Sequence, residues 1–154
     1  MKTVAQLKIR RMQYEDIQQV VEIEQASFPH PWDRQNFDEL LTGKTRGRVL
    51  SVVATPDSKI LAYAVWERKS LNDPMRLLNL AVHPSHRRQG LGACLIGRPG
   101  LKGYPLVADV IETNVPAQLF LRRLGWRCTE IIYQPYDKSD RDALRFEAQY
   151  VTQD

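Results

Sequence analysis

Residues 80–92 constrain this chain more than any other segment, because an apolar stretch leads there into a turn with two arginines and two glycines. We expect a strand to end in this segment and a helix to begin at about Gly90. The first turn of a helix presents amide groups without intrahelical partners, and its dipole is positive at that end. Gly90 and Gly92 let a phosphate approach the backbone, and Arg87 and Arg88 add charged donors. The segment therefore predicts a pyrophosphate site; the alternative is a basic turn that caps an ordinary helix.

Two common nucleotide-binding motifs do not fit these residues. A Walker loop ends in Gly-Lys-Ser/Thr, whereas Gly92 is followed by Ala93 and Cys94. A dinucleotide fingerprint has three glycines over six residues, and Arg87 stands where its first glycine would be. If the loop binds a phosphate, it does so as neither of these two motifs.

Length and composition narrow the class of protein. The 154 residues predict a single domain, residues 1–154, and the net charge of +4 is too small to indicate nucleic-acid binding. No apolar run has the length of a membrane span and no signal-peptide pattern is present, so we expect a soluble cytoplasmic protein that binds neither membrane nor nucleic acid. No metal site is predicted. Cys94 and Cys128 lie far apart among apolar neighbours, and we expect both to be buried thiols in a reducing compartment.

Charge is unevenly distributed along the chain. Residues 75–108 contain no Asp or Glu but include basic residues at Arg76, Arg87, Arg88, Arg98 and Lys102. Residues 14–41 reverse this balance, with Arg34 as their one basic residue against Glu15, Asp16, Glu22, Glu24, Asp33, Asp38 and Glu39. One region suits an anion and the other a cation; the alternative is that both are solvated faces.

The hydrophobic pattern predicts seven strands and four helices. We expect strands at residues 7–12, 48–55, 59–67, 75–82, 106–111, 127–133 and 143–151. Helices are expected at residues 14–28 and 32–41, at about residue 90 and, after the N-cap Asn114, up to residue 124. Glycines and prolines from Gly97 onward end the third helix early. The order predicts a three-layer α/β or α+β domain with a mixed sheet.

The loop resembles the acyl-CoA signature of the GNAT superfamily of acetyltransferases. The signature R-x-x-G-x-G follows a strand ending in Val-His-Pro, and Arg87, Gly90 and Gly92 match it. Residues 23–32, 114–126 and 141–144 resemble the ribosomal-protein-alanine N-acetyltransferase branch. The resemblance implies a GNAT-type three-layer domain with a mixed, mostly antiparallel sheet of about six to seven strands flanked by about four helices. It also implies acetyl-CoA as the acetyl donor.

The resemblance also implies which residues bind the donor. The loop from Arg87 and Arg88 onward would hold the pyrophosphate, through the backbone amides of Gln89, Gly90, Leu91, Gly92 and Ala93. The backbone of Leu80 and Val82 would pair with the pantetheine arm as an added strand does. Asn114 would contact the cofactor arm, a role that is compatible with N-capping.

Acetyl transfer needs a neutral amine and protonation of the leaving thiolate. The resembling family places a glutamate base at the position of Asp109, and Glu112 and Glu67 are further candidates; the alternative for each is a solvated or paired carboxylate. The family's tyrosine acid is replaced by Leu121, which leaves Tyr133 and Tyr136 as candidate phenols. The loop helix is also shorter than usual, because only residues 93–108 separate Gly92 from Asp109. Both departures allow slow or altered chemistry.

These observations give one leading function and two alternatives. The leading hypothesis is acetyl-CoA-dependent acetylation of a protein N-terminal α-amine, with the acidic residues 14–41 favouring an acceptor of basic character. One alternative is acetylation of a small amine such as a polyamine or an aminoglycoside. The other is a catalytically weak acyl-CoA sensor or interaction module.

Overall fold

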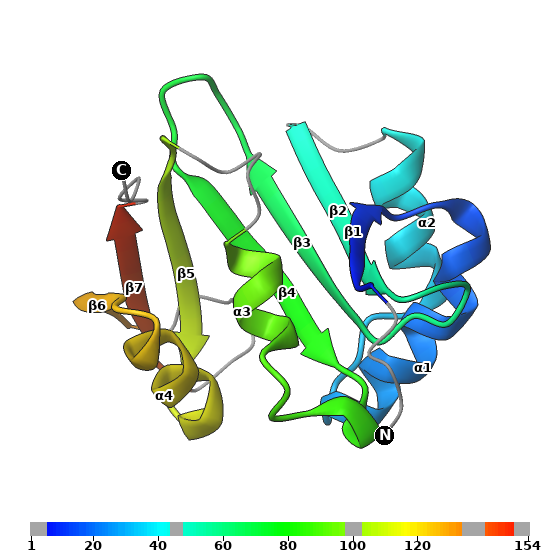
Figure 1. Ribbon diagram of the computed structural model, residues 1–154. Helices are drawn as coiled ribbons and strands as arrows, with labels where there is room; N and C mark the ends of the chain where they lie inside the picture. The colour runs from blue at the N-terminus through cyan, green and yellow to red at the C-terminus, as the bar shows by residue number, and fades with distance from the viewer. Residues whose placement is uncertain (1–5, 44–47, 98–102, 134–140, 150–154) are drawn as a thin grey trace. The chain divides into compact units, whose positions relative to one another are not determined.

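The computed structural model describes residues 6–43, 48–97, 103–133 and 141–149 (Figure 1). Its first half contains β1 (Lys8–Arg11), a 3-10 turn (Tyr14–Asp16), α1 (Ile17–Ser27), α2 (Arg34–Thr42), β2 (Arg48–Thr55), β3 (Ala62–Arg68) and β4 (Met75–Val82). Its second half contains a 3-10 turn (Pro84–His86), α3 (Leu91–Ile96), β5 (Pro105–Ile111), α4 (Val115–Arg123), β6 (Arg127–Ile132) and β7 (Ala143–Gln149).

The seven strands form one mixed sheet in the order β1-β2-β3-β4-β5-β7-β6. The pairs β1/β2, β2/β3, β5/β7 and β6/β7 are antiparallel, and β4/β5 is parallel. With the four α-helices of the described residues, this confirms the predicted mixed, mostly antiparallel α/β architecture.

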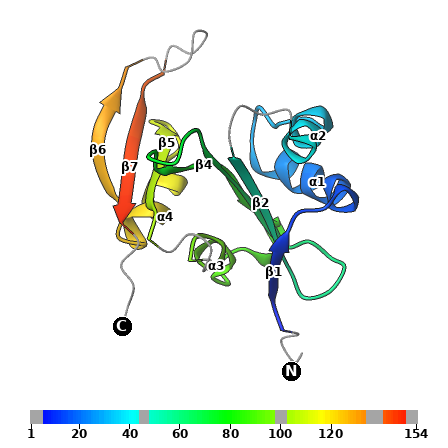
Figure 2. The same ribbon diagram turned by 90° about the horizontal axis from the view of Figure 1, so that it is seen from above.

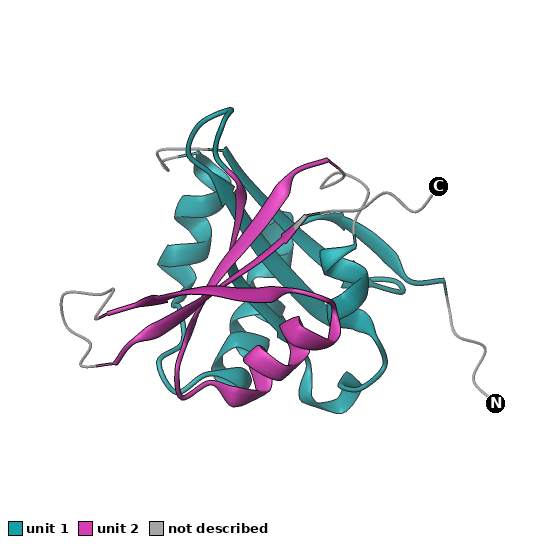
Figure 3. Cartoon of the chain, turned by 90° about the vertical axis from the view of Figure 1, so that its left-hand side faces the viewer, with its two compact units in different colours: residues 1–73, 78–100 teal, residues 74–77, 101–154 magenta. Residues whose placement is uncertain are grey.

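The chain divides into two compact units (Figure 3). Unit 1 comprises residues 1–73 and 78–100, and unit 2 comprises residues 74–77 and 101–154. Strand β4 contributes residues to both, so its first residues belong to the β5 ladder of unit 2 and the rest to unit 1.

Unit 1 is a three-layer arrangement. Val53, Tyr63 and Val65 on β2 and β3 pack against α1 and α2 through a core that includes Ile17 and Phe37. Because successive side chains of a strand point to opposite faces, the intervening residues of β2 and β3 face the other layer. That layer is α3, which contacts both strands and lies on the opposite side from α1 and α2 (Figure 2).

Strands β2 and β4 have the predicted bounds, and the other boundaries in unit 1 shift by up to three residues. Helix α1 begins at Ile17 rather than residue 14, because Tyr14–Asp16 forms a 3-10 turn. Helix α2 begins two residues later than predicted because the Asp33 side chain accepts a hydrogen bond from Asn36 N and so acts as the N-cap. Strand β3 begins at Ala62 rather than residue 59, because Lys59 N donates to Asp57 Oδ1 and Ile60 N donates to Gln19 Oε1. The amides of Lys59 and Ile60 therefore donate to side chains and are not available for hydrogen bonds to a neighbouring strand.

Unit 2 packs α4 beside the antiparallel strands β5, β7 and β6. Asn114 Oδ1 accepts from Ala117 N at 3.2 Å, which confirms the predicted N-cap. The core of this unit includes Leu121, Trp126 and Phe146, all of them buried. Gly125, at φ 88°, turns the chain after α4 into the left-handed conformation that favours glycine.

The expectation that both cysteines are buried is wrong. Cys94 and Cys128 are free thiols with exposed side chains. Helix α3 is short and buries only one face, which includes Leu91, Leu95 and Ile96, so Cys94 lies on its other side. Cys128 lies on β6, the last strand of the sheet, where most residues are exposed.

Candidate acetyl-donor and proton-transfer sites

The loop between β4 and α3 has an unusual backbone. Arg88 has φ 64° and Gly90 has φ 81°, so two positions within three residues are left-handed. A 3-10 turn, Pro84–His86, precedes them and was not predicted from the sequence. Its first amide is capped because His83 Nδ1 accepts from Ser85 N at 3.1 Å. Gly90 in the left-handed region is followed by the helical Leu91, and such a pair orients its amides toward one point, which is the geometry of an anion-binding nest.

The start of α3 supplies the amide donors. Cys94 N donates to Gly90 O at 3.1 Å and makes the first i to i−4 bond of the helix. By helix geometry the amides of Leu91, Gly92 and Ala93 precede that bond and lack an intrahelical acceptor. A Cβ added at Gly90 would meet no protein atom within 4 Å, so the chain leaves space beside this turn. Amides without intrahelical acceptors beside an open space suit a phosphate group, as expected for the pyrophosphate of acetyl-CoA.

Arg87 braces the loop against the rest of unit 1. Its Nε donates to Val82 O at 3.1 Å, and its Nη2 donates to Ser27 Oγ at 3.1 Å. Arg87 therefore joins the loop to the end of β4 and the end of α1. Its predicted contact with the donor remains a prediction, and so does that of the exposed Arg88.

The backbone of β4 has an edge that faces away from β3. His83 N donates to Leu61 O at 2.7 Å, which turns residues 79, 81 and 83 toward β3 and the backbone of Leu80 and Val82 the other way. The parallel register with β5 includes only Met75 and Arg76. Beyond those two residues the edge suits an added extended group, as the sequence predicted for the pantetheine arm.

Two side chains cap this edge. Leu80 N donates to Asn79 Oδ1 at 3.0 Å, and Val82 O accepts from Arg87 Nε. Two of the backbone groups assigned to the pantetheine arm, Leu80 N and Val82 O, are thus engaged by side chains of the protein. A bound donor would take the place of these side-chain contacts.

Glu24 is a buried carboxylate of α1 that the sequence analysis did not single out as a site residue. Its side chain accepts hydrogen bonds from Trp32 N at 3.0 Å, from Asn79 Nδ2 at 2.7 Å and from the Tyr63 hydroxyl. Burial raises the pKa of Glu24, although the bonds from Trp32 and Asn79 oppose this. A signal was present, because Glu24 falls seven residues after Ile17 and four after Val20, on the buried stripe of α1.

Asp109 in unit 2 lies between two arginines. Arg76 Nη1 is 2.5 Å from Asp109 Oδ2, and Arg145 Nε is 2.9 Å from Asp109 Oδ1. Hydrogen bonding to Asp109 raises the pKa of Arg145, and this outweighs the opposing effect of burial. Both carboxylate oxygens are therefore engaged, and a proton from a substrate would have to compete with a guanidinium group.

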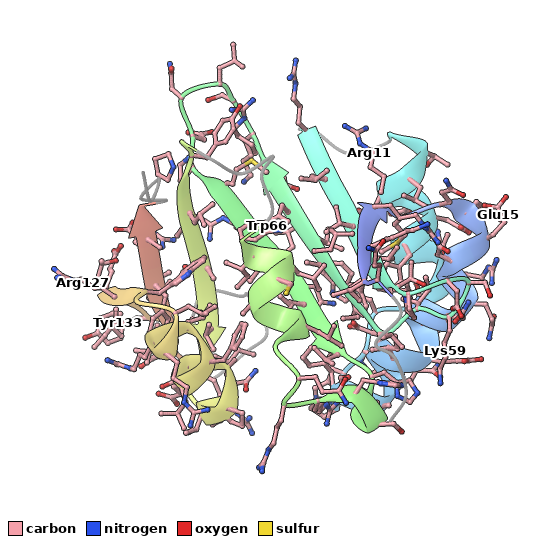
Figure 4. The ribbon with its side chains drawn as sticks, in the orientation of Figure 1. Arg11, Glu15, Lys59, Trp66, Arg127 and Tyr133 are labelled. Carbon is pink, nitrogen blue, oxygen red and sulfur yellow. The ribbon has the colours of Figure 1, made fainter. Side chains whose placement is uncertain are left out.

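The other proton-transfer candidates differ in exposure. Glu112 is exposed just after β5, with its backbone amide donating to Asp142 O at 2.9 Å. Tyr133 is 75% exposed and lies at the end of β6 (Figure 4), while Glu67 is partly buried on β3. Leu121 is only 2% exposed, so the position where the family has tyrosine points into the core of unit 2. Tyr136 lies outside the described residues.

The acidic residues 14–41 do not form one continuous acidic face. Asp16 is ion-paired with Arg10 at 2.6 Å, Glu24 is buried, and Asp33 caps α2. Glu15, Glu22 and Glu39 remain exposed, with Glu15 at the surface before α1 (Figure 4). Asp38 is half-buried on α2. The predicted attraction for a cation therefore depends mainly on the three exposed carboxylates.

Comparisons with known proteins agree with this geometry. An acetyltransferase (GNAT) domain family matches residues 47–128, which is more than half of the chain. A Bacillus subtilis (strain 168) protein, named as a candidate ribosomal protein bS18-alanine N-acetyltransferase, is 30% identical over 94% of this chain and 95% of its own length. The chain belongs to the GNAT acetyltransferase family.

Solved structures show the same fold. The ribosomal-protein-S18-alanine N-acetyltransferase from Escherichia coli superposes with a TM-score of 0.74, at 24% identity over 97% of both chains. Arabidopsis thaliana NAA60 in complex with acetyl-CoA superposes with a TM-score of 0.71, at 19% identity over 93% of this chain and 98% of that one.

This chain is therefore an N-acetyltransferase with acetyl-CoA as its acetyl donor, as the loop predicted. In the part of the chain that the structure describes, no helix has the length and apolar character needed to cross a bilayer.

Proposed function

We propose that this enzyme transfers the acetyl group of acetyl-CoA to the N-terminal α-amine of a protein, as a ribosomal-protein-alanine N-acetyltransferase does. The observation that carries this proposal is the likeness to the B. subtilis relative, which extends over 94% of this chain.

The proposal treats residues 1–154 as one acetyltransferase domain. The family match to residues 47–128 includes segments of both compact units, and the relative aligns with nearly the whole chain. Both units are therefore expected to be needed for activity.

In this proposal the loop and β4 bind the donor. The amides of Gln89, Gly90, Leu91, Gly92 and Ala93 would hold the pyrophosphate, with Arg87 and Arg88 beside them. The backbone of Leu80 and Val82 would pair with the pantetheine arm. Asn114, which also caps α4, would contact the same arm. Acetyl-CoA itself supplies the activated acetyl thioester.

The acceptor chemistry favours an α-amine. An α-amino group has a pKa of about 7.7–8.0, so roughly a tenth of it is neutral at pH 7, whereas a lysine amine near 10.4 is almost fully protonated. A weak base, or a water bound to one, is sufficient for the α-amine. We propose Asp109 and Glu112 as candidates for this base and Tyr133 as a candidate for the acid. The engaged oxygens of Asp109 favour Glu112, whose carboxylate is exposed.

We further propose that the acceptor has basic residues close to its N-terminus. The exposed carboxylates of Glu22 on α1 and Glu39 on α2 support this preference. Surface charges act mainly on the rate of encounter, and salt weakens them.

One structural observation favours a second function. The buried Leu121 offers no phenol to protonate the departing thiolate, which suits an acyl-CoA sensor with little turnover. The two functions differ in turnover, because a sensor binds acetyl-CoA without releasing the thiol.

A thiol-release assay with acetyl-CoA tests the proposal. Peptides beginning with Ala or Ser would be compared with the same peptides blocked at the N-terminus, and with polyamines and aminoglycosides. We expect release only with free N-termini, together with a mass gain of one acetyl group on the α-amine. Release with the small amines alone would identify a small-molecule acetyltransferase. Acetyl-CoA binding without any release would favour the sensor.

A further inference from the structure

A hydrogen-bonded chain joins the interior of unit 1 to the open edge of β4. It runs from the Tyr63 hydroxyl through Glu24 and Asn79 to the amide of Leu80. Glu24 is 39 residues from Tyr63 and 55 from Asn79 along the sequence, so only the fold brings these groups together. The chain ends on a backbone group that the proposed function assigns to the donor.

The orientation of the Asn79 amide is fixed by its two neighbours. A carboxylate such as that of Glu24 can only accept, so the Asn79 group facing it must be the donor Nδ2. The amide of Leu80 can only donate, so the group facing it must be the acceptor Oδ1. Reversing the amide would break both bonds. Only one orientation of the Asn79 side chain therefore connects Glu24 to Leu80, and we call this hydrogen-bonded link the connector.

Glu24 also holds the segment that follows α1. Its Oε1 accepts from Trp32 N at 3.0 Å, while Oε2 accepts from Asn79 and Tyr63. The Trp32 ring lies 5.5 Å from that of Phe37, which in turn lies 5.7 Å from the Tyr63 ring. The carboxylate therefore sits among packed aromatic side chains, where its position has little freedom.

Burying the Glu24 carboxylate in this part of the core is energetically unfavourable. Glu24 is 2% exposed, and among the described residues no lysine or arginine forms an ion pair with it. Apolar groups of similar volume often stabilise a core as well as buried charges or better. The raised pKa of Glu24 reflects the same cost of burial. A role in setting polar groups at the donor edge explains why a carboxylate is used here.

We propose that Glu24 is a positioning residue for acetyl transfer, which acts through Asn79 to set the Leu80 amide on the open edge of β4. This inference rests on the proposed donor site. When the donor arm binds, Leu80 N exchanges Asn79 Oδ1 for an acceptor of the arm, and Glu24 holds the Asn79 side chain in place during that exchange. Neither Glu24 nor Asn79 touches the reacting atoms in this role.

Two single substitutions break the connector at different atoms. Asn79→Asp places two carboxylates against each other. Glu24→Gln leaves one acceptor oxygen; while that oxygen stays on Trp32 N, two amide NH2 groups face each other unless Asn79 reverses and releases Leu80. We expect each variant to speed hydrogen exchange of the Leu80 amide without ligand. Each should also strengthen acetyl-CoA binding about three- to tenfold, because the donor arm no longer has to displace Asn79 Oδ1 from Leu80 N, and this factor corresponds to one hydrogen bond. The kinetic effect should fall on KM for acetyl-CoA more than on kcat.

The double variant Glu24→Gln/Asn79→Asp separates positioning from general damage. The introduced amide can donate to the introduced carboxylate, whose second oxygen can accept from Leu80 N. We therefore expect the double variant to recover most of the Leu80 protection and to return the affinity close to the wild-type value. Gln25→Ala, an exposed site one residue along α1, is the matched control and should leave both unchanged.

NMR-detected amide exchange and calorimetric titration with acetyl-CoA provide the readouts. Unchanged Leu80 exchange in the single variants, or a double variant that differs from the wild type as much as the singles do, would overturn the proposal. If the wild-type protein fails to bind acetyl-CoA, the proposed donor site fails instead. The exchange data in the absence of ligand still decide whether Glu24 positions Leu80.

Discussion

Asp109 and Arg145 form a two-point contact across neighbouring strands of unit 2. Arg145 Nε donates to Oδ1 at 2.9 Å, and Arg145 Nη2 donates to Oδ2 at 3.2 Å. The two residues are direct partners in the antiparallel β5/β7 register. The position of the Asp109 carboxylate is therefore fixed, but both of its oxygens already accept hydrogen bonds from Arg145.

Asp109→Asn tests whether this carboxylate accepts a proton during turnover. If it does, the rate should fall most below pH 8, where the α-amine must lose a proton, and a positioned base contributes about 10²–10⁴-fold. Above the pKa of the amine the loss should shrink. The diagnostic measurement is the shape of the pH–rate profile, because removing the charge between two arginines will also lower Tm.

Glu130→Gln is the matched control for that experiment. Glu130 Oε2 accepts from Arg145 Nη1 at 3.2 Å on an exposed part of β6, so this change removes a partner of Arg145 and leaves Asp109 in place. We expect a normal pH profile in this variant. A profile of unchanged shape in Asp109→Asn would make Asp109 structural and transfer the role to Glu112, which Glu112→Gln would then test.

Acetyl-CoA should stabilise the protein through the loop at Gly90. A ligand that binds only the native state adds about 2.7 kcal/mol at a hundredfold excess over Kd, and each kcal/mol raises Tm by roughly 2–4 °C for a chain of this size. Gly90→Ala should remove most of this rise, since its methyl group would occupy the open space beside the amides. Differential scanning fluorimetry with and without millimolar acetyl-CoA measures the effect.

Gly43→Ala controls for backbone strain in the same experiment. Gly43 has φ 75° and, like Gly90, no protein atom within 4 Å of an added Cβ. The left-handed conformation should lower the stability of each alanine variant by about 1–2 kcal/mol. Only the Gly90 variant should lose the rise in Tm that acetyl-CoA causes. Equal loss in both variants would mean that the loop is not part of the donor site.

The loop and most of the fold could be predicted because their signals are local. Gly90 and Asn114 act through their own backbone angle or a neighbour three residues away, and both were assigned correctly to helix starts. The strand at residues 48–55 was predicted with the bounds that the structure has, since its apolar, β-branched residues end at the turn residues Pro56, Asp57 and Ser58.

The polar networks could not be predicted because they depend on contacts between distant segments. Nothing near Asp109 in the sequence indicates that Arg76 and Arg145 engage both of its oxygens. The connector from Glu24 to Leu80 likewise needs α1 to lie beside β3 and β4. Cys94 was misjudged because apolar neighbours on a short helix do not say which face is buried.

Acceptor charge should influence the rate at low salt. Peptides with a free N-terminus and basic residues after it should react faster than acidic ones, because the exposed Glu22 and Glu39 attract them. The difference should shrink as salt approaches 1 M, where the screening length falls to about 3 Å. Steady-state kcat/KM for matched peptides at several salt concentrations measures this. Equal values for basic and acidic peptides at low salt would contradict the acidic-surface argument.

Asp16 and Glu24 should give the stability of the protein opposite dependences on pH. Burial alone would raise the pKa of Asp16, but hydrogen bonds from Arg10 and Gln13 N and the charge of Arg10 lower it overall. Its contribution is therefore present above the unfolded-state pKa near 3.9 and is lost as pH falls through the lower folded value. Burial raises the pKa of Glu24, so the folded state binds more protons there and stability falls as pH rises through that range.

Urea unfolding of Asp16→Asn and Glu24→Gln between pH 3 and pH 8 separates the two groups. Asp16→Asn should cost roughly 1–2 kcal/mol at pH 7, a value reduced because Arg10 is about a third exposed. This cost should shrink toward pH 3 as the wild type loses the same contact. Glu24→Gln should flatten the decline in stability that the wild type shows as pH rises from about 4.3. Glu15→Gln, an exposed neighbour of Asp16, should stay within about 0.5 kcal/mol of the wild type throughout. A cost of Asp16→Asn that does not change with pH would mean that the ion pair with Arg10 does not contribute to stability.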